Sequence, residues 1–227
     1  TCAAIYLASA GVISSIICSQ SSAHKFYGGI VPFIAQDCHK TVMVCLVRFL
    51  LLACQLKNNL FFFSYTKGPG LKYSLLSAAF LIKCVTLKLR IPFFSINHLE
   101  GHVFSSFIGR EQKFIFPFIS FIISGGHTIV LKASNVCFFT VLGRKIDYSL
   151  GEVFDKVSRF FGFWYPGACF LEKEALHGVS FFLKRKYFFS TNICFNISTS
   201  GLKTYFLVLS QYVFFTKRDM GNISFLF

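Results

Sequence analysis

Short apolar runs alternate along this chain with longer segments whose apolar residues recur every three or four positions. The runs at residues 3–18, 59–67 and 91–97 are typical of strands, the first as a hairpin and the second as a buried strand. Two longer segments are typical of helices, residues 26–56, which begin with a Gly-Gly and a Pro, and residues 71–89. One helical stripe with spacing i, i+3, i+4, i+7 is predicted to be buried: Val42, Cys45, Leu46 and Phe49. Strands that alternate with helices indicate an α/β fold.

The second half of the chain repeats this alternation. Residues 117–133 contain two apolar runs around Ser124-Gly125-Gly126, a composition suited to a tight hairpin with positive φ at its glycines. Residues 136–143 predict another strand, and residues 147–163 predict a helix that Tyr165-Pro166-Gly167 ends. Its apolar face is predicted to contain Leu150, Val153, Phe154, Val157, Phe160 and Phe161. We therefore expect two lobes, with residues 1–105 in the first and residues 106–227 in the second.

The apolar composition first requires a test for membrane spans. Apolar residues make up 54% of the chain, 32 residues are Phe, and the mean hydropathy is +0.61. The run at residues 41–56 carries Arg48 at its centre, and the run at residues 114–123 is half the ~20 residues that a spanning helix needs. The opening residues lack the basic start of a signal peptide. These features argue against a membrane protein.

Charge and cysteine usage suggest the surroundings in which the chain works. The net charge is +14, which favours polyanionic partners such as nucleic acid, although an A+T-rich gene would also raise the Lys content. The nine cysteines form no C-x-x-C pair, so we expect reduced and mostly buried thiols in a reducing compartment.

Two of the six histidines, His98 and His102, are four residues apart at a predicted helix start. On a helix both imidazoles project from one face within reach of one ion, but a metal site needs at least one more ligand. Such a pair is also often incidental. Glu100 is two residues after His98 rather than directly after it, which argues against the zinc-protease signature.

Two other features could hold a ligand, and a third is considered and rejected. The glycines of the Ser124–Gly126 turn leave backbone N–H groups open, as phosphate-binding loops do, although a Gly-Gly is by default a structural turn. Asp155 lies in a mostly apolar helix and could hold ribose hydroxyls or simply be solvated. Lys203 in SGLKT lacks the upstream glycine of a P-loop, so a nucleotide loop is rejected there.

The order of motifs is more specific than any one of them. NHLEGH, PFISFIISGGHT, IDYSLGEVFDKVSRFFGFWYPG and SGLKT follow one another, preceded by YGGIVPFIAQDCHKT and YTKGPGLKYSLL. This series resembles the TsaD family of tRNA threonylcarbamoyladenosine synthases, in its bacterial and organellar branch. The resemblance implies the two-lobed actin, sugar kinase and Hsp70 (ASKHA) fold of RNase H-like lobes. It also implies transfer of a threonylcarbamoyl group from threonylcarbamoyl-AMP to N6 of adenosine 37 in tRNAs reading ANN codons.

The resemblance assigns roles to particular residues. His98 and His102 match the family's metal ligands, with iron (Fe²⁺) or zinc (Zn²⁺) as the ion. The substrate-binding strand end and loop match Ile122, Ile123, Ser124, Gly125 and Gly126, and Asp155 matches the carboxylate on the ribose side of the adenylate. Ala168 stands where the family has a substrate-contacting glycine, and its methyl group is expected to crowd the ligand.

The chain also departs from the family at both ends. It begins past the T-S-C-D-[DE] motif and stops before the late Asp that is the third metal ligand, so the catalytic residues are unknown. We therefore expect a fold incomplete at both termini, weak metal binding and impaired activity. We also expect the paired imidazoles and the glycine turn to face a common cleft.

Three alternatives compete with the enzyme reading. A non-catalytic paralogue or scaffold partner of the same complex would have no use for the histidine pair, and an endopeptidase would need the missing Glu. A transporter would need a membrane span.

The resemblance also implies partners. In bacteria these are TsaB and TsaE, with TsaC supplying the adenylate, and in organelles the protein forms a homodimer. Localisation follows the branch and is cytoplasmic in a bacterium, and mitochondrial or plastid for a nuclear gene.

Overall fold

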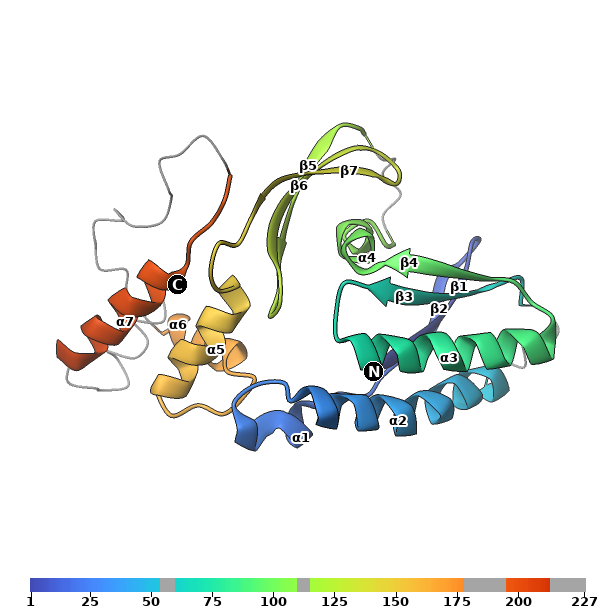
Figure 1. Ribbon diagram of the computed structural model, residues 1–227, viewed down its shortest axis with the longest axis horizontal. Coiled ribbons are helices and arrows are strands. Elements are labelled where there is room, and N and C mark those ends of the chain that lie inside the picture. The colour runs from blue at the N-terminus through green and yellow to red at the C-terminus, as the bar shows by residue number, and fades with distance from the viewer. Residues whose placement is uncertain (54–59, 110–114, 178–194, 213–227) are drawn as a thin grey trace. The chain divides into compact units, whose positions relative to one another are not determined.

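A computed structural model describes residues 1–53, 60–109, 115–177 and 195–212, and it contains both helices and strands (Figure 1). The chain divides into two compact units. The first holds Thr1–His24 and Ile30–Phe114, and the second holds Lys25–Gly29 and Ile115–Phe227. The protein is therefore mixed α/β, as its sequence predicts.

Strands and helices alternate along the first unit. Its elements in chain order are β1 (Cys2–Leu7), β2 (Gly11–Ile17), α1 (Ser21–His24), α2 (Pro32–Ala53), β3 (Phe63–Gly68), α3 (Lys72–Leu89), β4 (Phe93–Asn97) and α4 (His98–Ser105). β1 and β2 pair antiparallel, which confirms the predicted hairpin. β3 and β4 pair in parallel, and α3 forms the crossover between them, packed against β3 and α2 (Figure 1). The two predicted long helices are confirmed.

The buried face of α2 differs from the predicted stripe. Leu46 is buried, but Cys45 and Phe49 are exposed. Burial instead follows Ala35, Leu46 and Leu50, which are eleven and four residues apart and so lie in one line along the helix. An apolar residue one position from this line points about 100° away from it and remains in contact with water.

Two other burial predictions are wrong, one for β3 of this unit and one for the cysteines of both units. β3 begins at Phe63 and alternates half-buried and exposed residues, because only one of its faces is covered, by α3 and its neighbours. Of the cysteines in the described residues, Cys18 and Cys38 are half-buried, and the other five are exposed, as free thiols.

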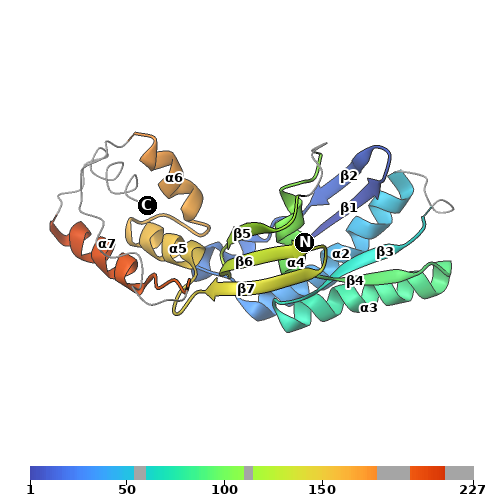
Figure 2. The same cartoon turned by 90° about the horizontal axis from the view of Figure 1, so that it is seen from above.

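The second unit combines an antiparallel sheet with a group of helices. Its elements are β5 (Phe118–Ile123), β6 (Thr128–Asn135), β7 (Phe138–Arg144), α5 (Leu150–Phe160), α6 (Ala168–Ala175) and α7 (Ser200–Tyr212). The sheet has the order β5-β6-β7 with both pairings antiparallel, and its strands lie side by side in Figure 2. The predicted hairpin, strand and helix are confirmed.

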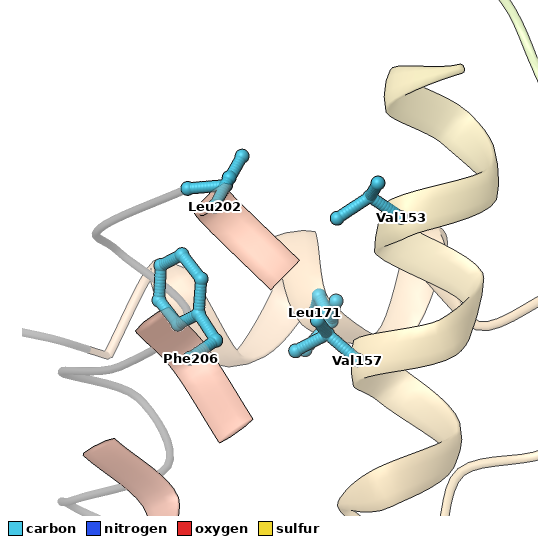
Figure 3. Close-up of a cluster of buried hydrophobic side chains, with 5 residues drawn as sticks. All are labelled: Val153, Val157, Leu171, Leu202 and Phe206. Atoms are coloured by element: carbon cyan, nitrogen blue, oxygen red, sulfur yellow. The ribbon is translucent and has the colours of Figure 1, made fainter. Parts of the chain in front are cut away.

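The helices of the second unit share one core, shown in Figure 3. Val153 and Val157 of α5 face Leu171 of α6 and two side chains of α7, Leu202 and Phe206 (Figure 3). Burying an aliphatic or aromatic side chain of this size stabilises a fold by roughly 1.5–3 kcal/mol. This cluster therefore fixes the position of α5, whose first turn contributes to the candidate site.

The end of α5 differs from the sequence prediction. Phe160, predicted on the apolar face, is 49% exposed and is the last residue of the helix. The chain then turns at Gly162, whose φ of +81° favours glycine, and the N–H of Phe163 donates to Ser158 O at 3.0 Å. The helix therefore ends before Tyr165-Pro166-Gly167.

Within the described residues, no helix is both long enough and apolar enough to cross a membrane.

Candidate functional site

The two paired histidines lie on α4, in the first unit. The helix begins directly after β4, and the side chain of Asn97 caps it by accepting from the N–H of Leu99 at 2.9 Å. His98 and His102 are both half-buried, their ring centroids are 4.5 Å apart, and their Nε2 atoms are 3.2 Å apart. The predicted pair therefore converges on one point through the same ring nitrogen.

This separation fits two ligands of one ion. Two nitrogens that each lie about 2.0–2.1 Å from a tetrahedral zinc ion are about 3.3 Å apart. The observed 3.2 Å between the Nε2 atoms is close to that value. Among the described residues, no third His, Cys, Asp or Glu gathers with them. The same 3.2 Å separation also suits a hydrogen bond between the two rings, so the metal-binding role of His98 and His102 stays a prediction, as does their position relative to the glycine turn.

The Ser124–Gly126 turn joins β5 to β6 in the second unit. The N–H of Ser124 donates to His127 O at 2.8 Å, and the N–H of His127 donates to Ser124 Oγ at 3.0 Å. Neither Gly125 nor Gly126 adopts a positive φ, so the expected positive-φ turn is wrong. The Ser124 hydroxyl closes the turn instead, which removes the need for a left-handed residue.

The glycines at the tip of this turn present their backbone to solvent. Both Gly125 and Gly126 are exposed, and a Cβ at either position would meet nothing within 4 Å. Within the described residues, their N–H groups donate no hydrogen bond. Two adjacent free amides without side chains can bind the oxygens of an anion such as a phosphate.

The start of α5 is built against this turn. Ser149 caps the helix, and its Oγ donates to Gly125 O at 2.6 Å. The N–H of Leu150 donates to Thr128 Oγ1 at 2.9 Å, and Thr128 is fully buried. A Cβ on Gly151 would lie 2.7 Å from Ser124 O and 2.8 Å from Gly125 Cα. Only a glycine at position 151 lets the helix approach so closely, and sequence reasoning did not single out these supporting residues.

The two isoleucines before the turn point in different directions. Ile122 is buried, and Ile123 is exposed. Since successive side chains of a strand alternate between faces, only one of the two can face a ligand through its side chain. Ile123 is the residue with an open side chain beside the turn.

Asp155 links α5 to the start of α6. Its Oδ1 accepts from the N–H of Gly167 at 2.9 Å and from the N–H of Ala168 at 3.3 Å. Burial raises the pKa of the Tyr165 hydroxyl, and the nearby Asp155 carboxylate raises it further. The structure therefore brings together two predicted substrate-binding residues, Asp155 and Ala168, in one capped helix start.

Asp147 is the most heavily hydrogen-bonded residue that sequence reasoning missed. Its carboxylate accepts from the hydroxyl of Ser198, from both the N–H and hydroxyl of Thr199, and from the N–H groups of Ser200 and Tyr148, at 2.6–3.1 Å. Burial raises the pKa of this carboxyl, but the hydrogen bonds outweigh burial and hold it well below its usual range. Asp147 thus ties the loop before α5 to the start of α7.

The start of α7 contains the SGLKT motif. The N–H of Lys203 donates to Thr199 O at 3.1 Å, as in the first turn of a helix. Its ammonium group lies 4.9 Å from the centre of the Tyr148 ring, and that of Lys156 lies 3.4 Å from the same ring. The motif is the start of α7, which packs next to α5.

Comparison with known proteins identifies this class of structure. A family model described as "TsaD: tRNA N6-adenosine threonylcarbamoyltransferase" matches residues 11–220. A protein named tRNA N6-adenosine threonylcarbamoyltransferase from Buchnera aphidicola subsp. Baizongia pistaciae is 35% identical over 214 residues, 93% of this chain and 62% of the relative. Relatives of the same name from Dictyoglomus turgidum and Trichlorobacter lovleyi are 35% and 34% identical, over 87% and 85% of this chain and 59% and 56% of their own length.

Fold and site together define a mixed α/β protein with a helix-borne histidine pair and a glycine turn braced by a helix start. The chain belongs to the TsaD family, and the resemblance of its motifs is confirmed. It spans 56–62% of the length of these three curated relatives.

Proposed function

We propose that this chain takes part in transfer of the threonylcarbamoyl group from threonylcarbamoyl-AMP to N6 of adenosine 37 in tRNAs reading ANN codons. The observation that carries the proposal is the glycine turn braced by α5, in a chain whose family bears the name of this transferase. We also propose that the two lobes belong to the actin, sugar kinase and Hsp70 class. This reading is supported by family membership and by the mixed α/β units.

In this proposal the second unit binds the adenylate. The N–H groups of Gly125 and Gly126 donate to the phosphate, beside the positive end of the α5 dipole. Asp155 lies five residues into the helix, about 7.5 Å along its axis from Leu150, and its carboxylate is within reach of the ribose side of the same nucleotide. The fixed amides also stabilise the charge that develops on the phosphate oxygen as AMP departs.

The chemical step then transfers an acyl group. N6 of the adenosine attacks the carbonyl carbon of the threonylcarbamoyl group and loses a proton. The new N–C bond forms as the bond between that carbon and the phosphate oxygen breaks, which releases AMP. A divalent ion, Fe²⁺ or Zn²⁺, held in part by His98 and His102, would supply Lewis-acid polarisation of a carbonyl or carboxylate oxygen.

We place the chain in the bacterial or organellar branch of the family. In a bacterium this predicts a cytoplasmic protein that works with TsaB and TsaE, and in an organelle it predicts a homodimer. These partners and compartments are supported by two of its motifs, HLEGH and SGGHT, whose residues are those of this branch.

A nucleoside assay tests the proposed transfer. The 227-residue chain is incubated with threonylcarbamoyl-AMP and an unmodified tRNA transcript that reads an ANN codon, and the digested RNA is analysed by mass spectrometry. We expect threonylcarbamoyladenosine in this transcript, in lower yield than with the Buchnera relative because impaired activity is predicted, and none in a transcript with guanosine at position 37. Absence of product, when the Buchnera relative makes it under the same conditions, would count against transfer by this chain.

Zinc titration tests the role of the histidine pair. Alanine at His98 or His102 leaves one imidazole, so we expect at least about tenfold weaker Zn²⁺ binding by isothermal calorimetry, since one coordinating group is lost. His177→Ala, an exposed histidine of the second unit, is the matched control. Equal affinity in all three variants would show that the pair binds no ion.

A further inference from the structure

The second unit displays a pair of exposed aromatic rings that the proposed transfer does not use. Phe26 and Trp164 meet edge to face with ring centroids 5.7 Å apart, yet they are 76% and 53% exposed. Two large rings that pack on each other while both stay in contact with water leave apolar faces open to a ligand.

One cation lies over these rings, and a second packs against Gly28, two residues after Phe26. The ammonium group of Lys25 lies 5.0 Å from the centre of the Trp164 ring, and Arg159 is exposed in the last turn of α5. The guanidinium of Arg159 packs against Gly28, where a Cβ would come within 2.5 Å of Nη1. Neither cation forms an ion pair within the described residues. Their positive charge is therefore available to a partner.

The local backbone holds these groups in place. Gly28 has a φ of +68°, and the turn after α5 has Gly162 at +81°. The N–H of Phe163 donates to Ser158 O at 3.0 Å, directly before Trp164. Side chains on a hydrogen-bonded turn lose less entropy on binding than side chains on a free loop.

The carboxylates of α5 already have partners of their own. Asp155 of α5 accepts from two amides of α6, and Glu152 of α5 pairs with Lys156 at 2.9 Å. The cations at Lys25 and Arg159 are therefore not neutralised by a described carboxylate. Flat apolar rings beside free cations match the flat bases and the phosphates of unpaired nucleic acid.

We propose that the second unit binds a single-stranded RNA loop through one surface patch. This patch, called the Trp164 patch, consists of Lys25, Phe26, Arg159 and Trp164. A base stacks on the indole of Trp164, and phosphates of the same loop contact Lys25 and Arg159. That the loop is the anticodon loop of a tRNA rests on the proposed function. If the rings instead anchored a protein partner, the two cations without an ion pair would not be needed, and the test distinguishes this outcome from RNA binding.

Trp164 is the single tryptophan of the chain, so its fluorescence reports this patch. A 17-nucleotide hairpin with the anticodon loop of an ANN-reading tRNA is titrated into the 227-residue chain, with a blunt duplex of equal length as comparison. We expect the hairpin to quench the emission by base stacking and the duplex to leave it nearly unchanged. Equal quenching by both RNAs, or none by either, would overturn the proposal.

Variants separate stacking from charge. Trp164→Leu and Phe26→Ala are expected to bind the hairpin about tenfold more weakly, measured by filter binding, because stacking on each base is lost. Trp164→Phe, which keeps a ring, is expected to bind close to the wild-type affinity. Lys25→Gln and Arg159→Gln are each expected to lower the slope of log K against log salt by roughly 0.7.

Matched controls lie on the sheet of the same unit. Phe138→Ala removes an exposed ring and Lys132→Gln removes an exposed cation, and both are expected to bind like the wild type. Circular dichroism verifies that each variant is folded. If the controls weaken binding as much as the patch variants do, the patch has no special role.

Failure of the patch and failure of the proposed transfer give different results. Equal RNA affinity in all variants, with threonylcarbamoyladenosine still formed, overturns the patch and leaves the transfer intact. Quenching and weakened variants without any product support the patch and count against the transfer. Unchanged hairpin binding together with loss of a protein partner in Trp164→Leu also overturns the RNA proposal.

Discussion

Replacing Gly151 by alanine is expected to destabilise the second unit by about 2 kcal/mol. The added Cβ would lie 2.7 Å from Ser124 O, 2.8 Å from Gly125 Cα and 2.9 Å from Gly125 N. These are backbone atoms of a hydrogen-bonded turn, so they cannot yield as a flexible side chain would, and such overpacking costs about 3 kcal/mol at the upper end of its usual range. Alanine recovers about 1 kcal/mol through its higher helix propensity. Urea denaturation followed by Trp164 fluorescence measures the difference in this unit.

The control for this prediction is Gly201→Ala. Gly201 also lies in a helix of the second unit, in the first turn of α7, and a Cβ there would meet nothing within 4 Å. The same exchange is therefore expected to stabilise the unit by about 0.4–1 kcal/mol. A Gly151→Ala variant as stable as the Gly201→Ala variant would show that the helix start does not need its close contact with the turn.

The order and type of the elements could be predicted from the sequence. The strand hairpin at the start, the long helices and the glycine hairpin all follow from apolar periodicity, which is a local property. Which face of an element is buried is not local. Phe49 and Phe160 continue apolar stripes, but each is exposed because no other described element covers that side of its helix. In a chain with 32 Phe residues, periodicity overstates burial.

Two local features of the candidate site could be predicted from residue type and spacing. The spacing of His98 and His102 implied a shared helix face, and their Nε2 atoms do converge. The glycine turn was predicted by its composition, but its backbone geometry was not, because the hydroxyl of Ser124 closes it.

The residues that support the site could not be found in the same way. Asp147 and Ser198 are 51 positions apart, and Gly151 meets Gly125 across 26 positions. A single sequence contains no signal for contacts of this separation. One weaker hint was present, because five of the nine acidic residues, Asp147 among them, lie between positions 100 and 155.

Replacing Asp147 by alanine is expected to reduce the free energy of unfolding at pH 7 by about 2 kcal/mol. The carboxylate accepts five hydrogen bonds from Tyr148 and from residues 198–200, so its removal leaves several donors without an acceptor. Asp147→Asn keeps one acceptor oxygen and is expected to lose about half as much. The matched control is Glu172→Gln, an exposed carboxylate of α6 with no hydrogen bond or ion pair within the described residues.

Lowering the pH provides a second test of the hydrogen bonds that Asp147 accepts. The hydrogen bonds lower the pKa of Asp147 in the folded protein, so its stabilisation is fully present above the ordinary pKa of about 3.9 and is lost as the pH falls toward the folded-state value. The difference in free energy of unfolding between wild type and Asp147→Asn should therefore decrease by up to about 1 kcal/mol when the pH is lowered from 5 to 3. Solvent screening of the partly exposed carboxylate reduces this effect. Urea denaturation at both pH values measures this change. A stability difference that stays constant between pH 5 and pH 3 would show that the Asp147 carboxylate is not what holds α7 to the loop before α5.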